Sequence, residues 1–201
     1  QIFRGIPYAK SPVGERRFRA PEPHGPWSGT LDATQPGNRA MQPQIPGRGS
    51  SAATYSEDCL AVDIYTPAAD GRARPVLFRI HGGAYYIGSG HDHDGSILAA
   101  QGDVVVVTVN YRLGVFGFLD LSKYDDDLAG SASNGFRDQI LALAWVKDNI
   151  ADYGGDPNNV TIFGESAGGG SVNAILAAPS ADGLYHRAIA HSGTAITNPP
   201  A

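Results

Sequence analysis

The sequence lacks several features that mark particular classes of protein. It holds a single cysteine, Cys59, so no disulfide forms within the chain and the redox compartment stays open. Lysine and arginine form no run and the formal net charge is -5, which argues against a nucleic-acid partner. The longest apolar stretch, residues 104–109, has the length of a strand and falls far short of the ~20 residues of a membrane-spanning helix.

What is present indicates one globular domain with many loops, since the chain has 201 residues, 26 glycines and 14 prolines. The chain opens at Gln1 without an initiator methionine and its last residues resemble a loop, so we expect a piece of a longer sequence and predict no cellular location. We predict a single partial domain over residues 1–201. Residues 1–55 would form a loop-rich N-terminal region, and residues 60–193 would carry the sheet and helices.

Hydrophobic patterns predict strands that alternate with helices. Apolar runs at 75–81 and 104–109 are typical of strands covered on both faces, whereas 60–65 alternates like a half-buried strand. Further strands are predicted at 160–163 and 187–191, and helices at 95–101, 138–151 and 169–178. This alternation favours an α/β fold with a mostly parallel central sheet and helices on both faces.

Residues 164–168, Gly-Glu-Ser-Ala-Gly, are the most informative motif. A G-x-S-x-G between a strand and a helix is the pattern of a nucleophile elbow, in which the serine hydroxyl stands above the sheet. Gly164 and Gly168 flank Ser166 where the tight turn leaves room only for small residues. The N-terminus of the following helix favours a developing oxyanion. The alternative is an ordinary turn in a glycine-rich chain.

A second glycine-rich segment follows the predicted strand 75–81. Gly82, Gly83 and Ala84 can turn their backbone N–H groups toward a tetrahedral oxygen, and each such donor is worth about 3–4 kcal/mol of barrier. Tyr85 and Tyr86 are candidates for the wall of an apolar acyl or alcohol site. The alternative is an ordinary turn at the end of a strand.

Together these motifs resemble the type-B carboxylesterase/cholinesterase family of α/β-hydrolases over nearly the whole chain. The matching segments follow the family's order: residues 3–9, 12–18, 56–60, 81–84, 110–114, 138–139, 154–157 and 163–168. The resemblance implies an incomplete α/β-hydrolase fold, of which this chain is the N-terminal portion. It also implies a serine esterase that needs no cofactor.

The resemblance assigns roles to the residues of both motifs. It implies that Ser166 is the nucleophile that accepts the acyl group. It implies that the oxyanion donors are the backbone N–H groups of Gly83, Ala84 and Ala167. Ala84 stands where many relatives have a third glycine, which is harmless if only its N–H is used.

Two residues in or near these motifs, Glu165 and Ser192, are further candidates for the site. Glu165, next to the nucleophile, is a candidate for substrate contact or for a plain hydrogen-bond acceptor. Ser192 matches a serine that hydrogen-bonds near the active site in relatives, although its neighbour His191 departs from the more usual glutamine.

Two structural ion pairs are also implied by the resemblance. They join Arg17 to Glu57 and Arg112 to Asp156, and they would pin loops to the sheet.

The catalytic base and acid are not expected in this chain. In α/β-hydrolases they follow the nucleophile in the order Ser, Asp/Glu, His. Only Asp182 and His186 follow Ser166 in that order, and they are too close in sequence to lie on separate strands. In the family both groups lie beyond the position of Ala201. The expected partners are therefore a small-molecule ester and the remainder of the polypeptide, or a complementary chain, that supplies the acid and the histidine.

A short run of histidine and aspartate is a candidate for metal binding. His91, Asp92, His93 and Asp94 resemble a metal-binding pair, but their alternate spacing without further ligands favours a solvated loop, and we predict no metal site.

Relatives with a disulfide at Cys59 have its partner where Gln42 stands, so Cys59 is expected to be a free, buried thiol. The segment 42–56 is short and has no tryptophan for cation–π binding of a quaternary ammonium, so choline esters are not the expected substrate.

The sequence therefore predicts a carboxylic-ester hydrolase that works through an acyl-enzyme on Ser166. The alternative is a non-catalytic binding or adhesion module on the same scaffold. By itself this piece is expected to be inactive and to expose an unpaired strand edge.

Overall fold

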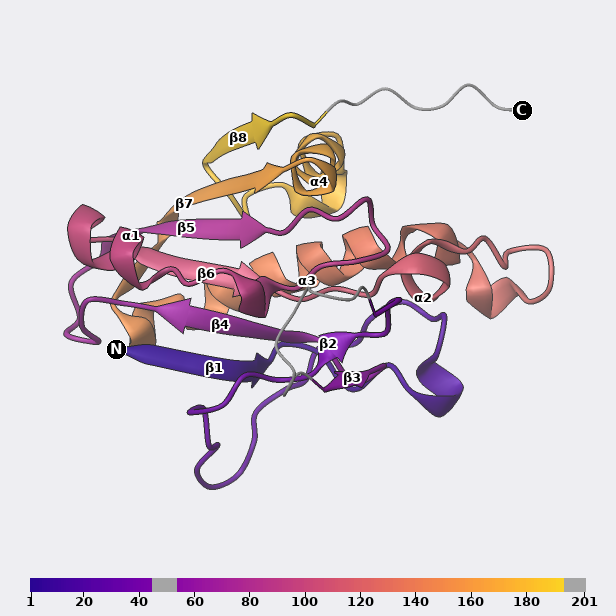
Figure 1. Ribbon diagram of the computed structural model, residues 1–201, viewed down its shortest axis with the longest axis horizontal. Helices are drawn as coiled ribbons and strands as arrows, with labels where there is room; N and C mark the ends of the chain where they lie inside the picture. The colour runs from indigo at the N-terminus through magenta and orange to yellow at the C-terminus, as the bar shows by residue number, and fades with distance from the viewer. Residues whose placement is uncertain (45–53, 194–201) are drawn as a thin grey trace.

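A six-stranded sheet forms the centre of the computed structural model, which describes residues 1–44 and 54–193 (Figure 1). The strand order is β1-β4-β6-β5-β7-β8. Strands β6, β5, β7 and β8 run parallel, whereas β4 is antiparallel to β6 and β1 is antiparallel to β4. The main-sheet strands are β1 Ile2–Pro7, β4 Ala61–Tyr65, β5 Arg74–Ile80, β6 Val105–Val109, β7 Gly155–Glu165 and β8 Arg187–His191. The predicted mostly parallel central sheet is confirmed.

Shorter elements surround this sheet. A second, two-stranded parallel sheet joins β2 (Arg39–Ala40) to β3 (Tyr55–Ser56). The α-helices are α1 Ser96–Gly102, α2 Gly114–Phe118, α3 Asn134–Asn149 and α4 Ala167–Leu176. Short 3-10 helices span Gly14–Arg16, Gly90–Asp92, Asp126–Leu128, Ser131–Ser133, Ile150–Tyr153 and Pro179–Ala181. Over the described residues, no helix combines the length and apolar character needed to cross a bilayer.

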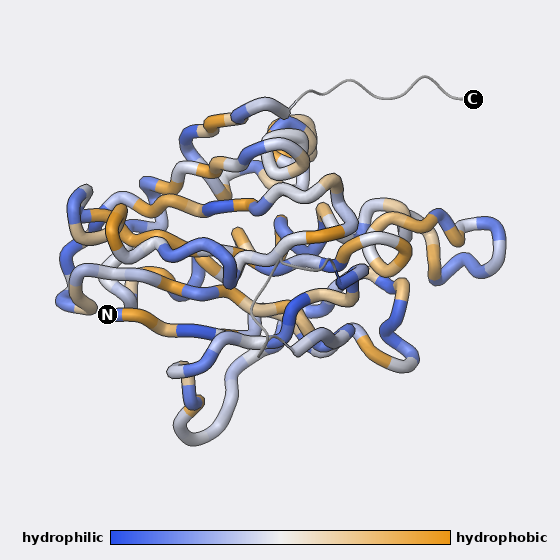
Figure 2. The backbone as a smooth tube through the Cα atoms, viewed as in Figure 1, coloured by the Kyte–Doolittle hydropathy of each residue, from blue (hydrophilic) through white to orange (hydrophobic). Residues whose placement is uncertain are grey.

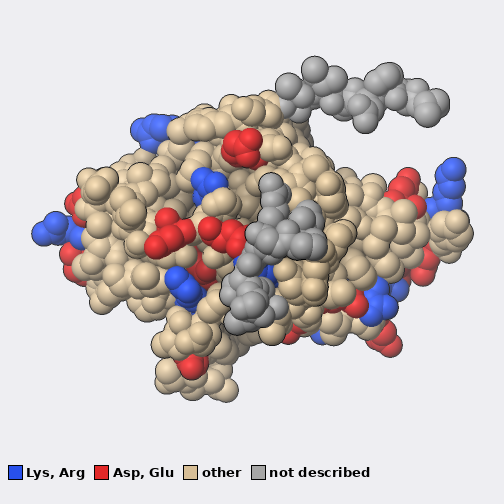
Figure 3. All heavy atoms as spheres, viewed as in Figure 1, with Lys and Arg blue, Asp and Glu red and all other residues tan. Residues whose placement is uncertain are grey.

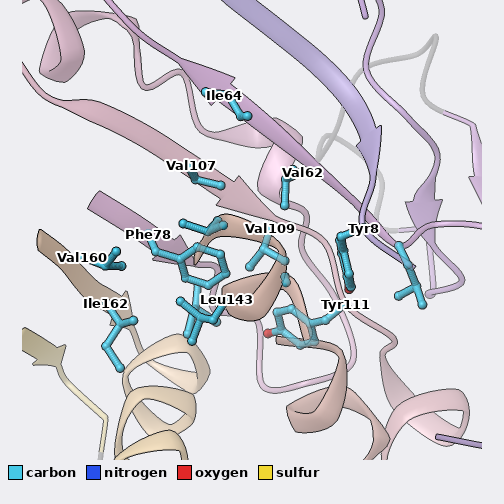
Figure 4. Packing of buried hydrophobic residues seen from close by; sticks show 14 of the residues in the cluster. Tyr8, Val62, Ile64, Phe78, Val107, Val109, Tyr111, Leu143, Val160 and Ile162 are labelled. Carbon is cyan, nitrogen blue, oxygen red and sulfur yellow. The ribbon is translucent and has the colours of Figure 1, made fainter. Parts of the chain in front are cut away.

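Helices cover both faces of the sheet because alternate strand residues are apolar on each face. On one face, Leu143 of α3 packs with Phe78 of β5 and Ile162 of β7, all without solvent exposure (Figure 4). On the other face, Ala99 of α1 packs against Val106 of β6. Burying one such large side chain stabilises the fold by about 1.5–3 kcal/mol. Hydrophobic residues accordingly follow the central strands along their length (Figure 2).

Strand β4 corrects one prediction, because all five of its residues are buried although its alternation indicated a half-buried strand. The polar residue Asp63 is 1% exposed. One of its carboxylate oxygens accepts the N–H of Gly5 at 2.8 Å, and the other lies 2.7 Å from Nδ1 of His91. A buried carboxylate is tolerated when it has such partners, so polarity at this position did not mean exposure.

Element boundaries also differ from those predicted. Helix α3 begins at Asn134, four residues before the predicted start, and ends at Asn149. The chain then turns at Gly154, whose φ is 81°. Strand β7 has 11 residues, and only its last part, which carries the apolar run, was evident from the sequence. The extra residues pair Gly155 with Arg74 of β5.

The buried ion pair of Arg112 is made with Asp138, not with Asp156 as predicted. The Asp138 carboxylate accepts Nε of Arg112 at 2.9 Å and Nη2 at 2.6 Å, and it also accepts the Arg112 backbone N–H at 3.0 Å. The two side chains are 3% and 0% exposed. Asp156 instead accepts the backbone N–H of Asn158 at 2.8 Å. Asp138 is the partner because the N-terminal part of α3 packs against the segment after β6, where a Cβ atom on Gly135 would lie 2.9 Å from the Arg112 carbonyl oxygen.

The second predicted pair is present in the structure. Glu57 accepts Nε of Arg17 at 2.5 Å and Nη2 at 2.7 Å. The Arg17 side chain is 44% exposed. Solvent screens such an exposed pair, so this contact fixes a loop more than it stabilises the fold.

We predict that Asp138→Asn destabilises the protein far more than Asp156→Asn. Removing the charge of Asp138 leaves the buried guanidinium of Arg112 uncompensated, at a cost of about 3–5 kcal/mol. In Asp156→Asn the side-chain amide oxygen still accepts the Asn158 N–H, so the loss stays below about 1 kcal/mol, the contribution of one hydrogen bond. Urea-unfolding midpoints of the complete protein that contains this chain measure both effects. A larger loss of stability in Asp156→Asn would instead support the predicted pair of Arg112 with Asp156.

Candidate active site

Ser166 stands alone between a strand and a helix. Strand β7 ends at Glu165 and α4 begins at Ala167. The backbone of Ser166 has φ 56° and ψ -122°, a conformation that a non-glycine residue rarely adopts. Its side chain is exposed, as the elbow pattern predicted.

The two flanking glycines are required by backbone contacts. A Cβ atom on Gly168 would lie 2.2 Å from the carbonyl oxygen of Ile80, and one on Gly164 would lie 2.4 Å from the carbonyl carbon of Gly168. The N–H of Ser166 donates to the His191 carbonyl at 2.9 Å. The elbow is therefore clamped between β5 and β8. The first N–H groups of α4 have no partner within the helix, which leaves the Ala167 donor beside the serine.

The glycine-rich loop after β5 lies against this elbow. A Cβ atom on Gly82 would lie 2.6 Å from the Glu165 carbonyl oxygen and 3.3 Å from Cβ of Ser166. Gly83 and Ala84 have φ values of 113° and 52°. The N–H of Ile87 closes the loop on the Gly83 carbonyl at 3.0 Å. The structure thus brings together the two motifs, although some 80 residues of sequence lie between them.

His81 holds the glycine-rich loop in place from within the protein. Its ring stacks on Tyr111 with a centroid separation of 4.4 Å, and its Nδ1 lies 2.8 Å from the Gly82 carbonyl oxygen. The Tyr111 hydroxyl donates to the His81 carbonyl at 2.8 Å. Burial lowers the pKa of His81 to about 4, so the ring is neutral near physiological pH. These contacts make His81 a scaffold for the loop.

Tyr85 and Tyr86, which follow the glycine-rich loop, differ in burial. Tyr85 is half-buried and packs against Phe118 and Phe136, at centroid distances of 4.9 and 5.6 Å. Its carbonyl accepts the N–H of Gly114 at 2.7 Å, which ties the loop to α2. Tyr86 is 49% exposed. Only Tyr86 therefore stands free in solvent, while Tyr85 is held by an aromatic cluster.

Glu165 has a neighbour, His191, for which the sequence alone predicted no role. It pairs in register with His191 of β8, so both side chains stand on the same face of the sheet. Ser192 has a φ of 50° and follows directly. Its neighbour Gly193 accepts Nδ2 of Asn173 at 3.2 Å, which ties this end of β8 to α4. Only the parallel pairing of β7 with β8 reveals that His191 lies beside Glu165.

A cavity of about 320 Å³ adjoins the loop on the side of Glu165. Its lining includes Gly82, Gly83, Arg79 and His93. Acidic and basic side chains gather near the middle of this face of the molecule (Figure 3). The cavity connects the loop to a charged region.

The His-Asp-His-Asp segment is only partly solvated, since Asp92 and Asp94 are exposed whereas the His91 side chain is buried. His91 is buried against Asp63, as described above, and Asp92 forms a two-pronged pair with Arg39. Asp94 accepts the N–H of Ser96, the first residue of α1, at 2.8 Å. Across residues 1–44 and 54–193, no three His, Cys, Asp or Glu side chains converge as metal ligands would. The carboxylates of Asp92 and Asp94 and Nδ1 of His91 thus have local partners, whereas Nε2 of His91 is buried without a partner among the described residues.

His186 lies far from the serine. Its Nδ1 accepts the N–H of Val160, and it precedes β8, at the end of the sheet opposite Ser166. The five to six residues between Val160 and Ser166 span about 17–20 Å of strand. His186 therefore cannot act as the base for Ser166 in this arrangement.

Cys59 is free and buried, as predicted, and burial raises the pKa of its thiol well above the usual range. Gln42 instead ties its segment to the loop: its amide nitrogen donates to the Gly88 carbonyl and its amide oxygen accepts the Gly88 N–H, both at 2.8 Å. Most of the segment in which a choline-binding tryptophan was sought, residues 45–53, lies outside the described residues.

Comparisons with known proteins agree with this geometry. The chain is 51% identical to a para-nitrobenzyl esterase of Bacillus subtilis over 199 residues, which is 97% of this chain and 40% of that protein. It is 46% identical to human carboxylesterase 3, covering 98% of this chain and 36% of that protein. The chain thus spans about two fifths of the length of these relatives.

Solved structures of esterases share the fold of this chain. A carboxylesterase of Geobacillus stearothermophilus superposes with a TM-score of 0.87 at 54% identity, covering 93% of this chain and 38% of that one. Juvenile hormone esterase from Manduca sexta, solved with OTFP covalently attached, gives 0.88 at 42% identity, covering 96% and 37%. A family model described as "Carboxylesterase family" matches residues 1–199. The chain belongs to the carboxylesterase family.

Proposed function

We propose that this chain carries the acylation half of a serine carboxylesterase site. The observation that carries the proposal is the contact between the loop 82–84 and the elbow, where Gly82 abuts both Glu165 and Ser166. An exposed serine on a strained strand-to-helix turn, facing a loop with left-handed backbone, is the arrangement that acyl transfer needs. Membership of the carboxylesterase family supports the same reaction class.

In the proposed reaction, Oγ of Ser166 attacks the ester carbonyl carbon while a base removes its proton. The carbonyl oxygen becomes an oxyanion, which accepts hydrogen bonds from the N–H groups of Gly83, Ala84 and Ala167. Collapse breaks the bond to the alcohol, which leaves with a proton, and the acyl group remains on Ser166. Water then attacks the acyl-enzyme and regenerates the serine.

The base and its acid are assigned to a part of the complete protein outside this chain. The relatives are more than twice as long as the matched region, which leaves ample room for both groups. His81 and His186 are engaged in the scaffold, as their contacts show. The covalent OTFP adduct described for the Manduca sexta relative is consistent with a nucleophile in this fold.

We predict that a fluorophosphonate probe labels Ser166 in the complete protein that contains this chain. The adduct should disappear in Ser166→Ala, because no other serine stands on the elbow. The exposed Ser122→Ala is the matched control and should label like the wild type. Intact mass and peptide mapping measure both. Equal labelling of Ser166→Ala would refute the assignment.

We also predict that Gly83→Ala disables ester hydrolysis. The new Cβ would lie 2.0 Å from the Ile87 carbonyl oxygen, so the loop must shift away from the serine. Loss of one aligned donor lowers kcat by about 10²–10³-fold. Gly29→Ala is the control, since Gly29 also has a positive φ, 78°, but nothing lies within 4 Å of the Cβ atom that the substitution adds. Equal kcat in both variants would show that the loop is not involved.

A further inference from the structure

Arg79 interrupts the apolar pattern of β5. Its neighbours Phe78 and Ile80 are buried in the core, so the Arg79 side chain stands on the opposite face of the sheet. There it lies in register between Thr108 of β6 and Phe163 of β7. A cation placed on a central strand needs a partner, which makes the surroundings of Arg79 informative.

The guanidinium of Arg79 has hydrogen-bond donors to spare. Its Cζ lies 5.6 Å from the centroid of the Phe163 ring, and Nη2 lies 3.4 Å from Nε2 of His93. Nε is shut off from solvent and has no hydrogen-bond partner among the described residues. Within the part of the chain that the structure describes, no carboxylate lies within ion-pair distance of it. Burial lowers the pKa of Arg79, yet a guanidinium remains charged at physiological pH.

The guanidinium lines the same cavity as the loop beside Ser166. Arg79, Gly83 and Glu165 all line this cavity. In the lining, Arg39 and Asp92 pair with each other through a hydrogen bond of 2.7 Å, whereas Glu165 lies near enough to Arg79 to favour its charged form without forming an ion pair with it. Arg79 is therefore the cation in this lining that is left for a ligand.

We propose that the cavity binds a carboxylate at the far end of an ester substrate, and that Arg79 selects it. The inference rests on the proposed esterase function. A planar guanidinium pairs with a carboxylate through two parallel hydrogen bonds, and the face of Phe163 limits competing water. Arg79 precedes Gly82 by three residues, which span at most about 10 Å. Glu165, near the serine, repels a second carboxylate placed close to the ester, so acids longer than the shortest dicarboxylates fit best.

Two chromogenic esters test this inference in the complete protein that contains the chain. p-Nitrophenyl hydrogen adipate ends in a carboxylate, and p-nitrophenyl heptanoate is a neutral ester of similar length. The wild type should have the higher kcat/KM for the adipate. In Arg79→Gln that preference should fall about tenfold, mainly through KM, because one charge-assisted contact is lost while the reacting atoms are unchanged. Arg72→Gln, at a surface arginine, should keep the wild-type preference.

The substrate ratio is measured within each preparation, so partial misfolding of a variant does not affect it. If Arg79→Gln does not fold, Arg79→Lys replaces it and should lose part of the preference, because an ammonium cannot form the two-pronged pair. A wild type that prefers heptanoate overturns the inference whatever the variants do. An unchanged ratio in Arg79→Gln also overturns it and leaves the esterase function intact. No turnover of either ester refutes the proposed function and this inference with it.

Discussion

The close approach of two backbones at the carboxyl ends of β5 and β7 is the constraint on which the site depends. Gly168 leaves room for the carbonyl of Ile80, and Gly82 leaves room for the carbonyl of Glu165. A single methyl group at either position would collide with backbone, which cannot rotate away as a side chain can. Parallel pairing of adjacent strands places both segments at one edge of the sheet, and so brings the loop to Ser166.

The rest of the fold holds that contact in place. The apolar residues of β5 and β7 fix the strands against α3 and α4, and Tyr111 and His81 brace the loop from within the protein. The backbone strain at Ser166 persists because its N–H is bound to β8 and the surrounding elements are densely packed. Inside this scaffold the buried charges of Arg112 and Asp138 are matched by each other and by hydrogen bonds.

Much of the fold and of the proposed site was predictable from the sequence because local rules govern them. Apolar runs predicted the central strands, and the glycines around Ser166 predicted the tight turn. Contacts between distant segments were not predictable from local rules. Nothing local distinguishes Asp138 from Asp156 as the partner of Arg112, because the choice depends on how α3 packs. Likewise the place of Arg79 on the outer face beside the cavity follows only from strand register.

The most direct measurement is a high-resolution crystal structure of the complete protein after reaction with a phosphonate ester. The account predicts a covalent bond from Oγ of Ser166 to phosphorus. It also predicts one phosphonate oxygen within about 2.7–3.1 Å of the backbone nitrogens of Gly83, Ala84 and Ala167. A phosphonate on another residue, or an oxygen turned away from the loop, would contradict it.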